Sequence, residues 1–330
     1  MSRKRSKSVK RIVGVALAAL ILIGMQAIPL PEGLSREGLC SIGFWGAAIC
    51  LWICESTPFS ISTILLIVMM PFYGIITLEE VWGNFASSTF FFIFASFAIT
   101  AAMATSNIPR RFATLLIRMS GASSMTLLLG FMMGTAVISA VMSNVPATAL
   151  FLTIALSLIQ DKKELVDCGF AKCVMIGIPY AAVIGCFMTP VGTAVNLVAI
   201  SLYEQTAGST IRFLDWMLVG IPVAVCTLVI CAFILQKMFC SSKVIHVDLT
   251  DHVEKEVRLD ARDRKILILI CVMFILWLSS TWIPQINNTI VAIIGMTVFF
   301  MPGVNILNMR QMEEETSLDV LMMVGGVQVL

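Results

Sequence analysis

Long apolar runs recur along this chain, and they limit what it can fold into. A helix needs about 20 apolar residues to cross the hydrocarbon core of a bilayer. Of the 330 residues, 58% are hydrophobic and only 13% are charged, whereas a soluble domain carries about 25% charged residues. The alternating segments of about 10 residues that a membrane β-barrel needs are absent from the sequence. The sequence therefore predicts an all-α polytopic membrane protein.

The N-terminal region predicts a basic tail followed by the first membrane span. Residues 1–11 contain six lysines and arginines, and the apolar run 12–30 is long enough to cross. No small-residue cleavage site of the A-x-A type follows this run, so we expect a membrane span rather than a signal peptide. We expect the basic tail to lie in the cytoplasm.

A 34-residue segment at 126–159 is too long for one crossing, and it is interrupted by Ser143, Asn144 and Pro146. If it is a re-entrant hairpin that opens to the cytoplasm, every lysine and arginine except Arg36 and Arg212 falls on the cytoplasmic side. A single crossing would instead place the basic linker at 241–265 outside. The positive-inside rule therefore favours the hairpin. We expect the protein to lie in the inner or plasma membrane.

A second interruption, "TPVGTAVN" at 189–196, lies within the next apolar segment at 171–200. Irregular backbone at membrane depth is tolerated only where protein buries it or where it lines a wet cavity. Paired broken helices mark the substrate and ion sites of many secondary transporters. A single break would more often serve packing, but two breaks that both carry Ser or Thr with Asn predict a binding site.

The charge distribution excludes several functions. The net charge is only +2, which gives no case for nucleic-acid binding. No Asp, Glu, Lys, Arg or His lies in the middle of a predicted span. An intramembrane protease would need catalytic or metal-binding groups at that depth, and a proton relay would need an ionisable group. We therefore expect a protein that is not an enzyme and whose ion site is built from neutral oxygens.

Three further segments of the chain have distinct patterns. The stretch "RRFATLLIRMSGAS" before the hairpin predicts an amphipathic helix along the membrane surface. An uninterrupted apolar span is expected at 216–238 and a polar cytoplasmic linker at 241–265. Further apolar runs follow the linker up to residue 330.

The order of these elements resembles the divalent anion–sodium symporter (DASS) family. "MSNVPATALFLTIAL" is similar to the hairpin tip of that family, and "GCFMTPVGTAVNLV" is similar to its second loop. The resemblance implies an inverted-repeat transporter with a re-entrant hairpin and a broken helix. It also implies a small divalent anion as substrate, sodium as the coupling ion, elevator-like alternating access, a lipid bilayer environment and a homodimer.

The resemblance also implies site residues. The family tip reads Ser-Asn-Thr, so Ser143 and Asn144 match, whereas Val145 lacks the hydroxyl that Thr148 would then supply. The substrate positions implied are Ser143, Asn144, Val145, Thr148, Thr193 and Asn196. The sodium positions implied are Ser139, Ser143, Asn144 and Gly192.

Two inverted repeats are expected from the resemblance, with the first at 39–240 and the start of the second at 266–330. An offset of 229 residues aligns Gly74 with Gly303, Leu78 with Leu307 and Ser88 with Ser317. On this alignment the partners of the hairpin tip fall beyond Leu330, so we expect the second repeat to be truncated.

The two breaks predict a secondary active transporter, and the resemblance implies a dicarboxylate, a tricarboxylate or sulfate as its substrate. Two alternatives stay open. One is an anion exchanger or arsenite-type permease of the same superfamily, which the missing hydroxyl at Val145 allows. The other is a membrane anchor or fragment that transports nothing, in which Asn144 would have no role.

Overall fold

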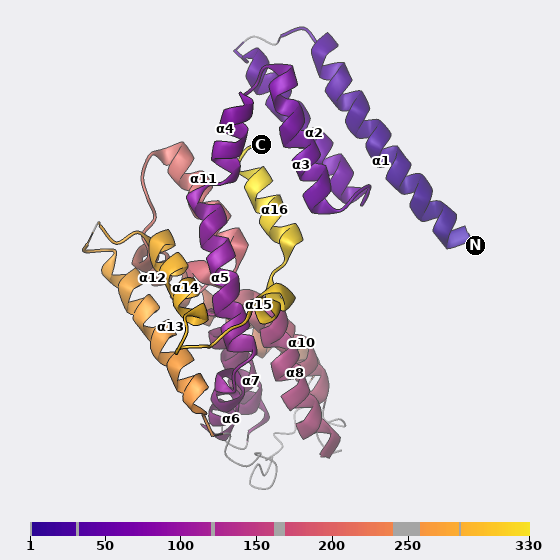
Figure 1. Ribbon diagram of the computed structural model, residues 1–330. Coiled ribbons are helices and arrows are strands. Elements are labelled where there is room, and N and C mark those ends of the chain that lie inside the picture. The colour runs from indigo at the N-terminus through magenta and orange to yellow at the C-terminus, as the bar shows by residue number, and fades with distance from the viewer. Residues whose placement is uncertain (1, 31–32, 120–122, 162–168, 240–257, 284) are drawn as a thin grey trace. The chain divides into compact units, whose positions relative to one another are not determined.

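The fold is all-α, as the sequence predicts. The computed structural model describes residues 2–30, 33–119, 123–161, 169–239, 258–283 and 285–330, and within these ranges it contains helices and no strand. The chain divides into two compact units (Figure 1). One comprises residues 1–91 and 317–330, and the other comprises residues 92–316.

The first unit contains α1, α2, α3, the 3₁₀ helix η1, α4, the first turn of α5, and α16. Their bounds are Ser2–Ala27, Arg36–Ile53, Phe59–Met69, Met70–Tyr73, Leu78–Phe85, Ser88–Ala104 for the whole of α5, and Leu318–Val327. Helix α16 packs on α3, and a β-carbon at Gly326 would lie 1.9 Å from the methyl group of Thr63. The hydroxyl of Ser60 donates a hydrogen bond to the carboxylate of Asp319 in the first turn of α16. A small residue and a buried polar contact therefore join these two helices, as is common in membrane proteins.

The second unit contains the rest of α5, the helices α6 to α8 and α10 to α15, and the 3₁₀ helix η2. Their bounds are Ile108–Met119 (α6), Ser124–Ser139 (α7), Asn144–Asp161 (α8), Phe170–Gly185 (α10), Pro190–Gly192 (η2), Ala194–Ala207 (α11), Phe213–Phe239 (α12), Ala261–Ser279 (α13), Asn288–Phe300 (α14) and Met309–Glu315 (α15). The linker predicted at 241–265 lies outside the described residues up to position 257.

Three helical segments of the described chain are long and apolar enough to cross a membrane. They are Val9–Ala27, Leu78–Ala104 and Phe213–Phe239. The two interrupted regions instead contribute shorter apolar helices, among them α7, α8 and α10. These spans and apolar helices are those of a multi-pass membrane protein.

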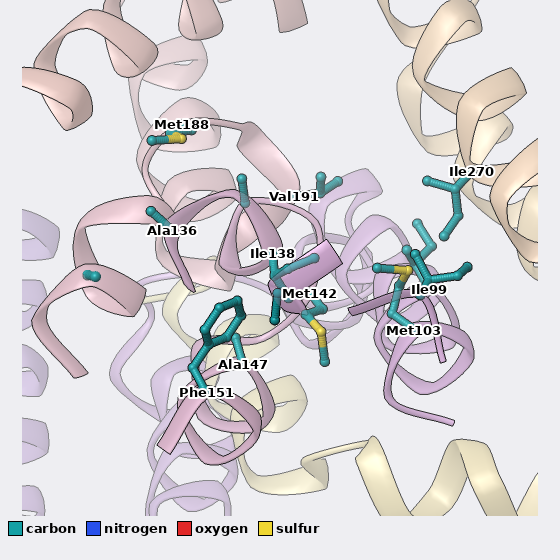
Figure 2. Packing of buried hydrophobic residues seen from close by; sticks show 14 of the residues in the cluster. Ile99, Met103, Ala136, Ile138, Met142, Ala147, Phe151, Met188, Val191 and Ile270 are labelled. Atoms are coloured by element: carbon teal, nitrogen blue, oxygen red, sulfur yellow. The ribbon is translucent and has the colours of Figure 1, made fainter. Parts of the chain in front are cut away.

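Helices α7, α8 and α10 form the centre of the core of the second unit. Phe151 of α8 is fully buried, one turn after Ala147, and belongs to the same hydrophobic cluster as Met142, which precedes α8 (Figure 2). A β-carbon at Gly134 of α7 would lie 2.7 Å from the ring of Phe151. The glycine therefore lets the aromatic ring lie directly against the α7 backbone, which brings the two arms of the interrupted segment together.

The N-terminal end of α13 fixes the corner between α5 and α6. The carboxylate of Asp263, which is buried, accepts hydrogen bonds from the backbone N–H and the side-chain amide of Asn107, both at 3.2 Å. The guanidinium of Arg262 donates to the backbone carbonyl and the hydroxyl of Thr105 and to the carbonyl of Ile306. These bonds to charged groups hold α6, and with it the start of the α7–α8 segment, at a defined place in the unit.

Two series of helices have corresponding positions along the sequence: α2, α3, α4 and α5 in the first, and α13, α14, α15 and α16 in the second. Gly74 and Gly303, which are 229 residues apart, both have positive φ angles, of 69° and 91°. Each glycine precedes a short helix that begins with a capping box, formed by Thr77 and Glu80 in α4 and by Asn308 and Gln311 in α15. The glycines follow the 229-residue offset, whereas the two capping boxes lie 231 residues apart. The two inverted repeats stay a prediction.

Candidate functional site

The first interruption separates α7 from α8. Helix α7 ends at Ser139, residues 140–143 form a turn, and α8 begins at Asn144. The break therefore starts at Ala140, earlier than the Ser143 expected from the sequence. Pro146 lies in the first turn of α8 rather than in the gap, because a proline there removes an N–H that has no intrahelical partner.

The second interruption separates α10 from α11. Helix α10 ends at Gly185, the short helix η2 follows, and Thr193 is extended, with φ −154° and ψ 148°, directly before α11. The break therefore covers 186–193, and Asn196 lies in the first turn of α11 rather than in the loop.

Direct hydrogen bonds join the two interruptions. The hydroxyl of Thr189 donates to the carbonyl oxygen of Ala140. The hydroxyl of Ser139 donates to the carbonyl oxygen of Ala182 at 2.7 Å. Both side chains are buried. The loop of one broken segment is thus fastened to the tip of the other.

Close backbone contact between α7 and α10 makes this joining possible. A β-carbon at Gly185 would lie 2.3 Å from both the Cα and the carbonyl oxygen of Ala136. No residue other than glycine fits at that distance from a backbone. Thr189 opens the interruption predicted at 189–196, but neither it nor Gly185 was expected to be a site residue.

Asn196 and Gly192 shape the second interruption from within. The side-chain amide of Asn196 donates to the carbonyl oxygens of Cys186 at 2.8 Å and Thr189 at 2.9 Å, and 1% of this residue is exposed. A β-carbon at Gly192 would lie 2.4 Å from the carbonyl oxygen of Cys186. Trp216 adds a third bond, from its indole N–H to the carbonyl oxygen of Phe187 at 2.9 Å. The loop is therefore held by many bonds.

Some of the polar side chains that border the two interruptions have no hydrogen-bond partner among the described residues. Ser143, Asn144 and Thr193 are partly exposed, and their side chains make no hydrogen bond to any described residue. The hydroxyl of Thr148 donates to the carbonyl oxygen of Asn144 at 2.7 Å. Val145 is 72% exposed. Of the residues expected at the site, three thus offer unpartnered polar groups, whereas Ser139, Thr148 and Asn196 already donate to the protein backbone.

The helix ends at the two interruptions have opposite electrostatic character. A helix leaves its first N–H groups and its last carbonyl groups without intrahelical partners. The N-terminal ends of α8 and α11 therefore favour an anion, and the C-terminal ends of α7 and α10 favour a cation. Among the residues that the structure describes, no cluster of three His, Cys, Asp or Glu side chains is present. The candidate site is thus built from backbone groups, hydroxyls and amides.

Comparison with known proteins identifies the family. A profile of the citrate transporter family (CitMHS) matches residues 49–330, which include both interruptions. The chain belongs to this family. Because the family is one of transporters, the expectation that the protein is not an enzyme is confirmed.

Individual members with curated names are similar to the chain. A sodium-dependent dicarboxylate transporter, SdcS, from Staphylococcus aureus strain bovine RF122 / ET3-1 is 30% identical over 233 residues. The protein of the same name from strain NCTC 8325 / PS 47 is also 30% identical over 233 residues. In both cases the match covers 68% of this chain and 44% of the relative. The chain thus covers less than half the length of these relatives. Together with the family match, they confirm the resemblance to a DASS-like permease.

Proposed function

We propose that the protein is a sodium-coupled secondary active transporter of small dicarboxylates or tricarboxylates. The observation that carries this proposal is the joining of the two interrupted helices by Thr189 and Ala140, beside the unpartnered side chains of Ser143, Asn144 and Thr193. The sodium and the dicarboxylate in the names of the relatives support the choice of ion and of substrate class.

In this proposal a substrate carboxylate lies at the N-terminal ends of α8 and α11. The amide of Asn144 and the hydroxyls of Ser143 and Thr193 donate to its oxygens, since none of these groups has another partner in the described chain. Val145 contributes its exposed apolar surface rather than a hydrogen bond. Thr148 lies one turn into α8, where its hydroxyl stabilises the carbonyl of Asn144. Asn196 acts indirectly, because it fixes the loop that presents Thr193.

The sodium ion is proposed to travel as a second cargo near the C-terminal ends of α7 and α10. The oxygen ligands offered are the hydroxyls of Ser139 and Ser143, the amide oxygen of Asn144 and the backbone carbonyl of Gly192. The hydroxyl of Ser139 donates a hydrogen bond to the carbonyl oxygen of Ala182, which leaves the lone pairs of its own oxygen for a cation. Neutral oxygens at these positions suit a hard cation, which prefers oxygen ligands.

Movement of the site across the membrane is proposed to involve both broken segments together. The bonds from Thr189 to Ala140 and from Ser139 to Ala182 join the segments, so one does not shift without the other. This favours elevator-like alternating access over the independent opening of two gates. The proposal includes a homodimer in the inner or plasma membrane, with a cytoplasmic N-terminus and two inverted repeats, of which the parallel between Gly74 and Gly303 is a supporting observation.

Ligand-dependent thermal stability of the purified protein in detergent tests this proposal. A ligand at about 100 times its Kd stabilises the folded state by about 2.7 kcal/mol. We expect succinate or citrate to raise the unfolding temperature in sodium chloride but not in potassium chloride. The variant Asn144→Ala should unfold at the same temperature without ligand and gain nothing from it. Equal effects in both salts, or full stabilisation of Asn144→Ala, would contradict the proposal.

A further inference from the structure

Helix α6 carries the only charges of a long stretch of the chain. Between Glu80 and Asp161 the sequence has three charged residues, Arg110, Arg111 and Arg118, and all three lie on α6 and are exposed. No acidic side chain of α6 is available to pair with them. The side chains of Arg111 and Arg118 form no ion pair or hydrogen bond with any described residue, whereas Arg110 has a partner.

Apart from Arg110, the residues of α6 that are exposed form two adjoining strips. Arg111 and Arg118 are seven residues apart, which places them on one side of the helix about 10 Å from each other. The neighbouring strip consists of Leu115 and Met119, which are 53% and 73% exposed. Beyond that strip lies the face that packs on the core, which includes the buried Ala113. Going around the helix, core contacts thus give way to exposed apolar side chains and then to arginines.

The attachment of α6 places its start beside the polar first turn of α13. Asp263 holds Asn107, the residue directly before α6, and Asp263 lies in the first turn of α13. The first turn of α13 is polar, with Arg262, Arg264 and Lys265, before its apolar run begins. Helix α6 has 12 residues and is therefore about 18 Å long, too short to cross a bilayer of about 30 Å. It starts at the level where the polar turn of α13 meets the apolar part of that helix.

We propose that Arg111 and Arg118 bind the phosphate groups of anionic phospholipids, while Leu115 and Met119 enter the acyl region beside them. A guanidinium matches a phosphate with two parallel hydrogen bonds, and a helix with an apolar strip next to a basic strip lies in the interface plane. At a fully aqueous surface, the exposed apolar side chains of Leu115 and Met119 would lie in water. This favours a lipid over a soluble anion. The site fixes the depth of the helix that leads into the α7–α8 segment, and it does not depend on which solute is transported.

Thermal unfolding of the protein in mixed micelles tests the lipid site, with phosphatidylglycerol compared with phosphatidylcholine. We expect the native protein to gain stability from phosphatidylglycerol at low mole fractions and not from phosphatidylcholine. Each arginine near an anionic surface contributes about 1 kcal/mol, so the double variant R111Q/R118Q should need about 30-fold more phosphatidylglycerol for the same gain. The matched control R310Q, at an exposed arginine of α15, should respond like the native protein.

The other outcomes are also decisive. The charge-conserving variant R111K/R118K should keep most of the response, which covers the case in which the neutral double variant does not fold. Equal responses to the two lipids, or an unchanged response of R111Q/R118Q, would overturn the proposal. Stabilisation by free phosphate or by succinate that is lost in R111Q/R118Q would assign the arginines to a soluble anion instead. Stabilisation only by an acidic peptide would assign them to a protein partner.

Discussion

The hydroxyl of Thr189 donates a hydrogen bond to the carbonyl oxygen of Ala140, 49 positions earlier in the chain. This bond joins the loop of one interrupted helix to the tip of the other. Because α7 ends at Ser139, the carbonyl of Ala140 has no helical partner to satisfy it. Thr189 therefore has a structural role at the centre of the candidate site.

Replacement of Thr189 by valine should destabilise the protein. The substitution conserves shape and removes the donor, so the buried carbonyl of Ala140 loses its partner at a cost of about 1–3 kcal/mol. Unfolding temperature in detergent measures this loss. The control is Thr206→Val on α11, where the hydroxyl of an exposed threonine bonds only within its own helix. Equal stability of the two variants would show that the bond to Ala140 contributes nothing.

Replacement of Gly185 by alanine should be severely disruptive. The new β-carbon would lie 2.3 Å from the Ala136 backbone, so α7 and α10 must move apart, at a cost of about 1–3 kcal/mol or more. Gly24 on α1 provides the control, since nothing lies within 4 Å of a β-carbon there and alanine favours a helix by about 1 kcal/mol. The yield and unfolding temperature of the two variants compare them. A well-folded Gly185→Ala protein would contradict the close packing.

The two asparagines at the interruptions should behave in opposite ways. Asn196→Ala removes two buried hydrogen bonds and should lower the free energy of unfolding by about 2 kcal/mol or more. Asn144→Ala removes no bond within the described chain and should change stability by about 0.5 kcal/mol or less. Uptake by Asn144→Ala should nevertheless fall about tenfold or more, since a hydrogen bond to a charged group contributes about 1.5–3 kcal/mol. If Asn144→Ala proved the less stable of the two, these roles would be reversed.

Removal of the Asp263 carboxylate should loosen α6. Asp263→Ala leaves the N–H and amide of Asn107 without their buried acceptor, and we expect a loss of about 2–3 kcal/mol. Limited proteolysis near α6, measured together with unfolding temperature, should detect the change. Asp215→Ala is the matched control, because its ion pair with Arg212 is half-exposed and such pairs contribute about 1 kcal/mol or less. Identical proteolysis of the two variants would argue against this anchor.

Local sequence signals predict much of the fold, but they do not predict the hydrogen bonds that join the two interruptions. Apolar runs predict the membrane helices because burial in lipid depends on composition and length. Proline, serine and asparagine predict that helices break near 143 and 189. They misplace the ends by a few residues, because Pro146 and Asn196 are accommodated in the first turns of α8 and α11. The bond from Thr189 to Ala140 depends on tertiary packing, which no local pattern encodes.

Which polar side chains near the breaks have a hydrogen-bond partner can be seen only in the structure. Ser139, Asn144 and Asn196 are all polar residues near a break, and the sequence does not distinguish their roles. In the structure Ser139 and Asn196 bond to backbone carbonyls, whereas Asn144 does not. Which polar group near a break stays unpartnered depends on the neighbouring segment, so it cannot be read from residue type alone.

Uptake of radiolabelled succinate into proteoliposomes that contain the purified protein tests the central claim most directly. An inward sodium gradient is compared with an inward potassium gradient of equal size, and protein-free liposomes give the background. Sodium-coupled transport predicts accumulation of succinate above equilibrium with sodium only, and its loss in Asn144→Ala. Uptake that is the same in both gradients, or that stays at the protein-free background in both, would contradict it.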